Sequence, residues 1–131
     1  MSKKFWLVLA LIVGASAYGQ GQASAASDYD TYAYCYLSDG YDYALYTYQD
    51  YPNNTDAYYA EFYGYYAQYY AGVAYDYDDQ ESWYYAYLYG SYATDHALNA
   101  YYETGLGYAY DAYIYLSDGT NYAYDAYVYF Q

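Results

Sequence analysis

Basic side chains are almost missing from this sequence. Its 131 residues include 2 Lys or Arg against 16 Asp or Glu. Both basic residues, Lys3 and Lys4, lie at the amino terminus. Beyond them no side chain can form a salt bridge through Lys or Arg. Nucleic-acid binding is therefore excluded, because phosphate recognition depends on these two residue types.

Cysteine, proline and histidine are equally scarce, with one of each. The single Cys35 cannot form an intramolecular disulfide, so in an oxidising compartment it is either a buried thiol or an intermolecular link. His96 is the one imidazole, and no Lys or Arg beyond residue 4 is present to stabilise an oxyanion or a phosphate. Paired carboxylates leave glycoside hydrolysis open by residue type, although the chain is a small scaffold for it. We expect a protein that is not an enzyme, with no catalytic residue.

The amino terminus has the pattern of a signal peptide. Two lysines precede an apolar run over residues 5–13, and Ala15-Ser16-Ala17 is a small-x-small cleavage site. A membrane-spanning helix needs about 20 apolar residues, roughly twice this run. We predict a cleaved signal peptide over 1–17, a flexible lead-in over 18–28 and one tyrosine-rich domain over 29–131. The mature protein is then secreted and has no membrane span.

Tyrosine is abundant, with 34 Tyr beside 3 Phe and 2 Trp. Disordered chains are poor in aromatic residues, so this amount of ring surface favours a folded or assembled state. Internal repeats accompany the tyrosines: AYCYLSDG at 33–40 matches AYIYLSDG at 112–119, residues 108–115 recur at 122–129, and residues 58–67 resemble 84–93 more loosely. These offsets favour a strand-plus-turn unit of about 13 to 14 residues and a hairpin of about twice that length.

Tyrosine alternates with small or β-branched residues in these repeats, and alternation is typical of β-strands. Asp-Gly is a strong hairpin-turn signal, and it occurs at Asp39-Gly40 and Asp118-Gly119. We predict an all-β fold of repetitive antiparallel hairpins, arranged as a meander or a solenoid-like sheet with a Tyr-rich face.

The motif Tyr-x-Tyr-x-x-Tyr-x-Tyr breaks the alternation by one residue. We interpret this slip as a β-bulge at Asp111-Ala112 and at Asp125-Ala126, which returns the tyrosines to one face of the sheet. Residues 57–74, with paired tyrosines and alanines, are also compatible with a short amphipathic helix.

The densest acidic cluster comprises Asp76, Asp78, Asp79 and Glu81. Carboxylates are the ligands of hard cations such as Ca²⁺, so calcium is the one candidate cofactor. No calcium-loop pattern is present, and acids that keep a sticky surface soluble explain the cluster equally well. Asn53 begins an Asn-Asn-Thr sequon and is a candidate glycosylation site.

Secretion, repeats and tyrosine content favour a structural protein. We expect a self-assembling β-sheet fibre, matrix or coat, or an adhesive component, whose main partner is a second copy of the chain. By composition alone the chain resembles tyrosine-rich secreted structural proteins such as silk, eggshell and cuticle components. One alternative is an extracellular binding module with an exposed Tyr platform for polysaccharide or another surface, and a third is a small outer-membrane β-barrel. Because the acids repel one another near neutral pH, protonation or divalent cations should favour assembly.

Overall fold

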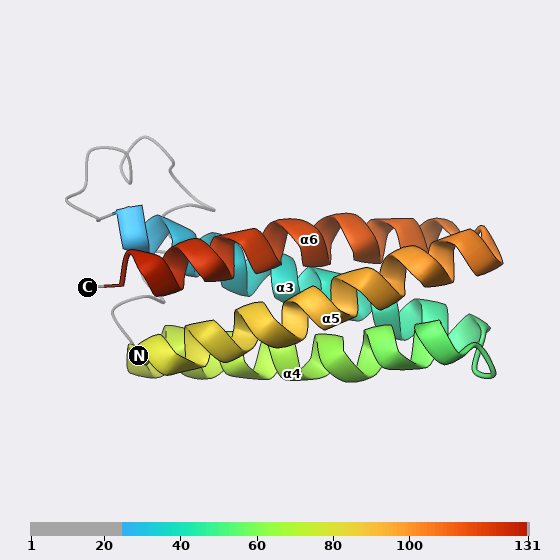
Figure 1. The fold of residues 1–131 in the computed structure, drawn as a ribbon, viewed down its shortest axis with the longest axis horizontal. Helices are drawn as coiled ribbons and strands as arrows, with labels where there is room; N and C mark the ends of the chain where they lie inside the picture. The colour runs from blue at the N-terminus through green and yellow to red at the C-terminus, as the bar shows by residue number, and fades with distance from the viewer. Residues whose placement is uncertain (1–24, 131) are drawn as a thin grey trace.

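The computed structural model describes residues 25–130, and these form four α-helices without a β-strand. The helices are α3 (Ala25–Asp50), α4 (Thr55–Tyr77), α5 (Gln80–Thr104) and α6 (Gly107–Val128). Each helix packs against its neighbour in sequence, and α6 closes the bundle by packing against α3. In Figure 1, α6 lies along the top and α4 along the bottom of the view, and α3 and α5 cross between them. The predicted signal peptide, and the lead-in up to residue 24, lie outside the described residues.

The predicted all-β fold is wrong. Asp39-Gly40 lies inside α3 and Asp118-Gly119 inside α6, so neither pair forms a hairpin turn. Asp111-Ala112 and Asp125-Ala126, interpreted as β-bulges, also lie within α6. The helical alternative for residues 57–74 agrees with α4, which extends beyond that range at both ends.

Small residues, not tyrosines, form the core of the bundle. The buried positions of each helix recur at alternating intervals of three and four residues, which is the heptad spacing of coiled coils. In α4 they are Ala57, Ala60, Gly64, Ala67, Ala71 and Ala74, and in α6 they are Ala109, Ala112, Leu116, Gly119, Ala123 and Ala126. Because the distance between packed helices depends on the side chains at the contact, alanine and glycine allow the backbones to approach closely.

The AYCYLSDG and AYIYLSDG repeats meet at the centre of the α3–α6 pair. A Cβ added to Gly40 would lie 2.7 Å from Leu116 Cγ, and one added to Gly119 would lie 2.8 Å from Leu37 Cγ. Each repeat therefore supplies a leucine that fills the space left by the glycine of the other repeat. This reciprocal contact relates α3 to α6 by an approximate twofold axis.

The other two helices obey the same relation through the looser repeat. Gly64 of α4 and Gly90 of α5 occupy equivalent positions in residues 58–67 and 84–93. An added Cβ at Gly64 would lie 3.9 Å from Leu116, and one at Gly90 would lie 3.5 Å from Leu37. The sequence repeats thus describe a symmetric helical core.

Two helix ends, the start of α4 and the end of α5, follow ordinary capping rules. The side chain of Asn54 accepts a hydrogen bond of 2.8 Å from the N–H of Ala57 at the start of α4. Gly105, with a φ of 67°, ends α5 in the left-handed conformation that glycine adopts without strain. Asp56 and Glu81 lie in the first turns of α4 and α5, where a negative charge is favourable to the helix dipole.

Candidate functional site: a tyrosine surface on an acidic bundle

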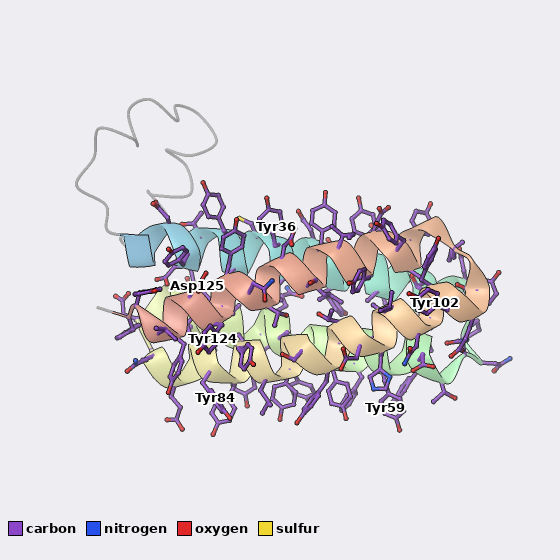
Figure 2. All side chains as sticks on the ribbon, turned by 45° about the horizontal axis from the view of Figure 1, so that its top comes forward. Tyr36, Tyr59, Tyr84, Tyr102, Tyr124 and Asp125 are labelled. Atoms are coloured by element: carbon purple, nitrogen blue, oxygen red, sulfur yellow. The ribbon has the colours of Figure 1, made fainter. Side chains whose placement is uncertain are left out.

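Tyrosine rings cover the seams between the helices. Residues two apart on an α-helix are separated by about 200° around its axis. The two tyrosines that flank a buried alanine therefore lie on opposite sides of it, over the seams with two different helices. For example, Tyr122 contacts Tyr36 of α3 and Tyr124 contacts Tyr87 of α5. Rings and carboxylates project along the outer edges of the bundle, where Tyr59 and Tyr84 are labelled (Figure 2).

A continuous row of rings runs along the α3–α6 seam, and we call it the α3–α6 ladder. It consists of seven tyrosines that alternate between the two helices, in the order Tyr129, Tyr29, Tyr122, Tyr36, Tyr115, Tyr43 and Tyr108. Successive ring centroids are 5.7, 6.4, 5.7, 5.8, 5.4 and 6.4 Å apart. Consecutive rings from the same helix are one heptad apart in sequence, so the ladder has the period of the core.

A second row covers the α4–α5 seam. It connects Tyr59, His96, Tyr63, Tyr89, Tyr70 and Tyr85, in that order, with centroid distances of 5.2, 5.8, 6.1, 5.7 and 5.2 Å. The rings of Tyr70 and Tyr89 are 5° from parallel. Such aromatic pairs are worth about 0.5–1.5 kcal/mol beyond the area they bury. The two rows therefore add to the stability of a core made mostly of alanine.

His96 joins the second row to a polar cluster at one end of the bundle. Its Nδ1 is 2.7 Å from Oδ1 of Asp56. The hydrogen bond between Glu103 and Asp56 lowers the pKa of Asp56, and the interaction with His96 lowers it further. The same hydrogen bond raises the pKa of Glu103. The side-chain amide of Asn54 donates to Glu103 Oε2 at 2.6 Å. These contacts fasten the start of α4 to the end of α5.

Sequence reasoning missed this cluster. Asp56 and His96 are 40 residues apart, and no local pattern links them. The heptad spacing was the available signal, because His96 lies one heptad beyond Tyr89 and Asp56 one heptad before Tyr63. The contacts of His96 with Asp56 and of Asn54 with Glu103 account for the cluster as a structural clamp.

The most solvent-exposed tyrosines lie at both ends and on one side of the bundle. Tyr77, at the end of α4, is 79 % exposed, and Tyr102, at the end of α5, is 74 % exposed. Tyr129, just beyond the end of α6, is 56 % exposed, and Tyr69 on the side of α4 is 53 % exposed. Since α4 and α5 are antiparallel neighbours, Tyr77 and Tyr102 lie at opposite ends. The bundle therefore presents reactive phenols in several directions.

The four acids of the candidate calcium cluster lie around the α4–α5 connection. Asp78 is the C-cap of α4, with a φ of 53°, and Asp79 is the N-cap of α5. Asp79 accepts a hydrogen bond from the Ser82 hydroxyl, and Glu81 accepts one of 3.4 Å from Tyr85. Over residues 25–130 no group of three or more His, Cys, Asp or Glu side chains is arranged to hold a metal ion. Asp78 and Asp79 thus lie at helix ends, Asp79 and Glu81 accept side-chain hydrogen bonds, and Asp76 lies in the last turn of α4.

The remaining predicted site residues, Cys35 and Asn53, lie in different parts of the bundle. Cys35 is a free, half-buried thiol in α3, and its burial, followed by the charge of Asp39, raises the pKa of the thiol. Asn53 is exposed in the connection between α3 and α4, one residue before the N-cap.

Within residues 25–130, none of the helices combines the length and the apolar composition that a membrane crossing requires. Comparison of the whole chain with known proteins finds no matching family, curated protein or solved structure.

Proposed function

We propose that this protein is a secreted, non-catalytic structural protein that displays tyrosines on an acidic helical bundle for contact and oxidative cross-linking between copies. The observation that carries the proposal is the exposure of Tyr69, Tyr77 and Tyr102 in different directions. A particle with three or more reactive points forms a network when its copies are joined, whereas one with two forms only a chain. Secretion is inferred from the signal-peptide pattern at residues 1–17.

The cross-linking chemistry needs an external one-electron oxidant of the peroxidase class. Each of two tyrosines gives one electron to the oxidant and its phenolic proton to water. The two phenoxyl radicals then join through a carbon–carbon bond between the positions ortho to the oxygens. The hydrogens displaced from the joined carbons restore the two phenol groups, and the product is dityrosine.

The acidic surface supports control of this association. The chain carries a formal net charge of −14 at pH 7, so copies repel one another at low ionic strength. Salt, divalent cations or protonation should therefore increase the yield of cross-linked material.

A peroxidase with hydrogen peroxide tests the proposal on the mature chain. We expect covalent oligomers and dityrosine fluorescence, and a lower yield of both in the triple variant Y69F/Y77F/Y102F. The matched control Y34F/Y63F/Y87F removes the same number of hydroxyls from half-buried rings and should cross-link like the parent. Equal yields from the two triple variants, or no oligomers from the parent, would contradict the proposal.

A second candidate function is polysaccharide binding by a platform on α4. Tyr58, Phe62, Tyr65 and Tyr69 follow helical spacing and are all exposed, and the rings of Tyr58 and Phe62 are stacked with centroids 6.0 Å apart. A row of flat rings suits the apolar faces of sugar rings. Retention of the monomer on insoluble polysaccharide, lost on F62A and kept on Y102A, would favour this candidate over cross-linking.

A further inference from the structure

The α3–α6 ladder is an unbroken path of one kind of side chain from one end of the bundle to the other. Its terminal rings, Tyr129 and Tyr108, are 56 % and 45 % exposed, whereas the rings between them are half-buried. They lie 21 residues apart on α6, so the path spans about 30 Å at 1.5 Å per residue. No step within it exceeds a centroid distance of 6.4 Å.

Tyrosine is among the side chains most easily oxidised by one electron, and contact between rings allows an electron to pass from one to the next. Because every member of the ladder is a phenol, each transfer is close to neutral in energy. Carboxylates act on two rings of the path, Asp39 and Asp111 on Tyr43 and Asp118 and Asp125 on Tyr122. Their negative charges favour the transient positive charge on a ring that has lost an electron but not yet its proton. No basic side chain from residue 25 onward opposes them.

We propose that the α3–α6 ladder conducts a one-electron oxidation along the bundle, moving a tyrosyl radical between its two exposed ends. An external one-electron oxidant takes an electron from the first ring, whose phenolic proton passes to water. The radical then takes an electron from the next ring and a proton from water, which restores the first phenol. The second ring loses its own proton and becomes the radical. This conduction needs no bond between copies, so it stands or falls independently of cross-linking.

Tyr115 is the ring that tests the path. It contacts Tyr36 on one side and Tyr43 on the other, and the described ring contacts contain no other link between the two halves of the ladder. Y115F keeps the stacked ring but removes the oxidisable phenol. Tyr124 is the matched control, because it lies on the same helix but contacts Tyr87 outside the ladder.

The experiment places a photo-oxidant at one end of the ladder. A ruthenium polypyridyl complex is attached to V128C in a C35S background, because Val128 is exposed and adjacent to Tyr129. A flash with a sacrificial electron acceptor generates Ru(III), and a nitroso spin trap marks the tyrosyl radicals for peptide mapping at low protein concentration. We expect marks on Tyr129 and on the distant Tyr108, with the same pattern in Y124F.

In Y115F the marks on Tyr108 should fall to background while those on Tyr129 remain. Unchanged marking of Tyr108 in Y115F would show that oxidation reaches it through solution, and absence of marks there in the parent would show that the ladder does not conduct. Either result overturns the proposal. Y43F, which interrupts the next step, provides the same test if Y115F does not fold.

Discussion

Glycine and leucine at the centre of the bundle illustrate how single residues set the helix spacing. Gly40 is part of an Asp-Gly pair that commonly marks a turn, yet here it lies within a helix against Leu116. Its missing side chain leaves the space that the leucine occupies. The same residue type thus serves close packing at one site and a left-handed cap at Gly105.

The two buried glycines Gly40 and Gly64 should respond to alanine in opposite ways. A Cβ at Gly40 would lie 2.9 Å from the backbone nitrogen of Leu116, which cannot rotate away, whereas at Gly64 the nearest atom is 3.7 Å away. We expect G40A to lower the free energy of unfolding by about 1–3 kcal/mol through overpacking. G64A should raise it by up to about 1 kcal/mol, since alanine favours helix over glycine. Urea unfolding measures both, and equal effects in the same direction would contradict the packing described.

Helix and strand periods compete within each repeat, which explains why the sequence prediction of the fold failed. Tyr-Ala-Tyr reads as alternation over three residues, but the alanines taken alone recur at three and four residues along whole helices. The Tyr-x-Tyr-x-x-Tyr-x-Tyr slip, interpreted as a bulge, is the same heptad stagger, and the 14-residue offset equals two heptads. The repeats and the helical option at 57–74 could be found from sequence, whereas the partner of each repeat could not.

The residue types on the surface could also be predicted from the sequence, but their arrangement in space could not. Abundant phenols and acids without counter-ions follow from composition. The alternation of α3 and α6 rings in one ladder does not, because it depends on the antiparallel register that Leu37, Leu116 and their facing glycines fix.

The ladder should also resist ionisation of its inner phenols. Burial is the main cause that raises the pKa of Tyr43, and the neighbouring Tyr115 is the second. Burial is also the main cause that raises the pKa of Tyr122, and the neighbouring Tyr36 is the second. A group whose folded-state pKa is raised loses its contribution to stability as the pH rises through that value. We expect cooperative loss of helix above about pH 10, at a midpoint that moves upward in Y43F/Y122F. Circular dichroism with phenolate absorbance measures it, and Y102F, at an exposed ring, should leave the midpoint unchanged.

At the scale of the whole molecule, uncompensated negative charge governs the response to pH. Burial raises the pKa of Asp28, burial and then Asp42 raise that of Asp39, and the hydrogen bond with Asp56 raises that of Glu103. These groups bind protons more tightly in the folded state, so their protonation stabilises the fold as the pH falls. Asp56 has the opposite sign, because its pKa is lowered, and its contribution is lost only at lower pH.

The melting temperature should therefore rise between pH 7 and about pH 5. It should decline again at lower pH, as the pH falls through the lowered pKa of Asp56. Added salt at pH 7 should raise it as well, by screening the repulsion. Scanning calorimetry on dilute protein measures both effects. A melting temperature that falls steadily from pH 7 to pH 5 would show that the acids stabilise the fold in their ionised form.

The approximate twofold axis gives the chain a palindromic order, in which α3 corresponds to α6 and α4 to α5. The first and last described helices meet where the ring centroids of Tyr29 and Tyr129 are 5.7 Å apart. Residues 25 and 130 therefore lie at the same end of the bundle as the connection between α4 and α5. A linker between the two ends, with the chain opened at Asp78-Asp79, would yield a circular permutant that retains all four seams. The four helices therefore form a closed ring of contacts, and the packing between them does not depend on which connection is left open.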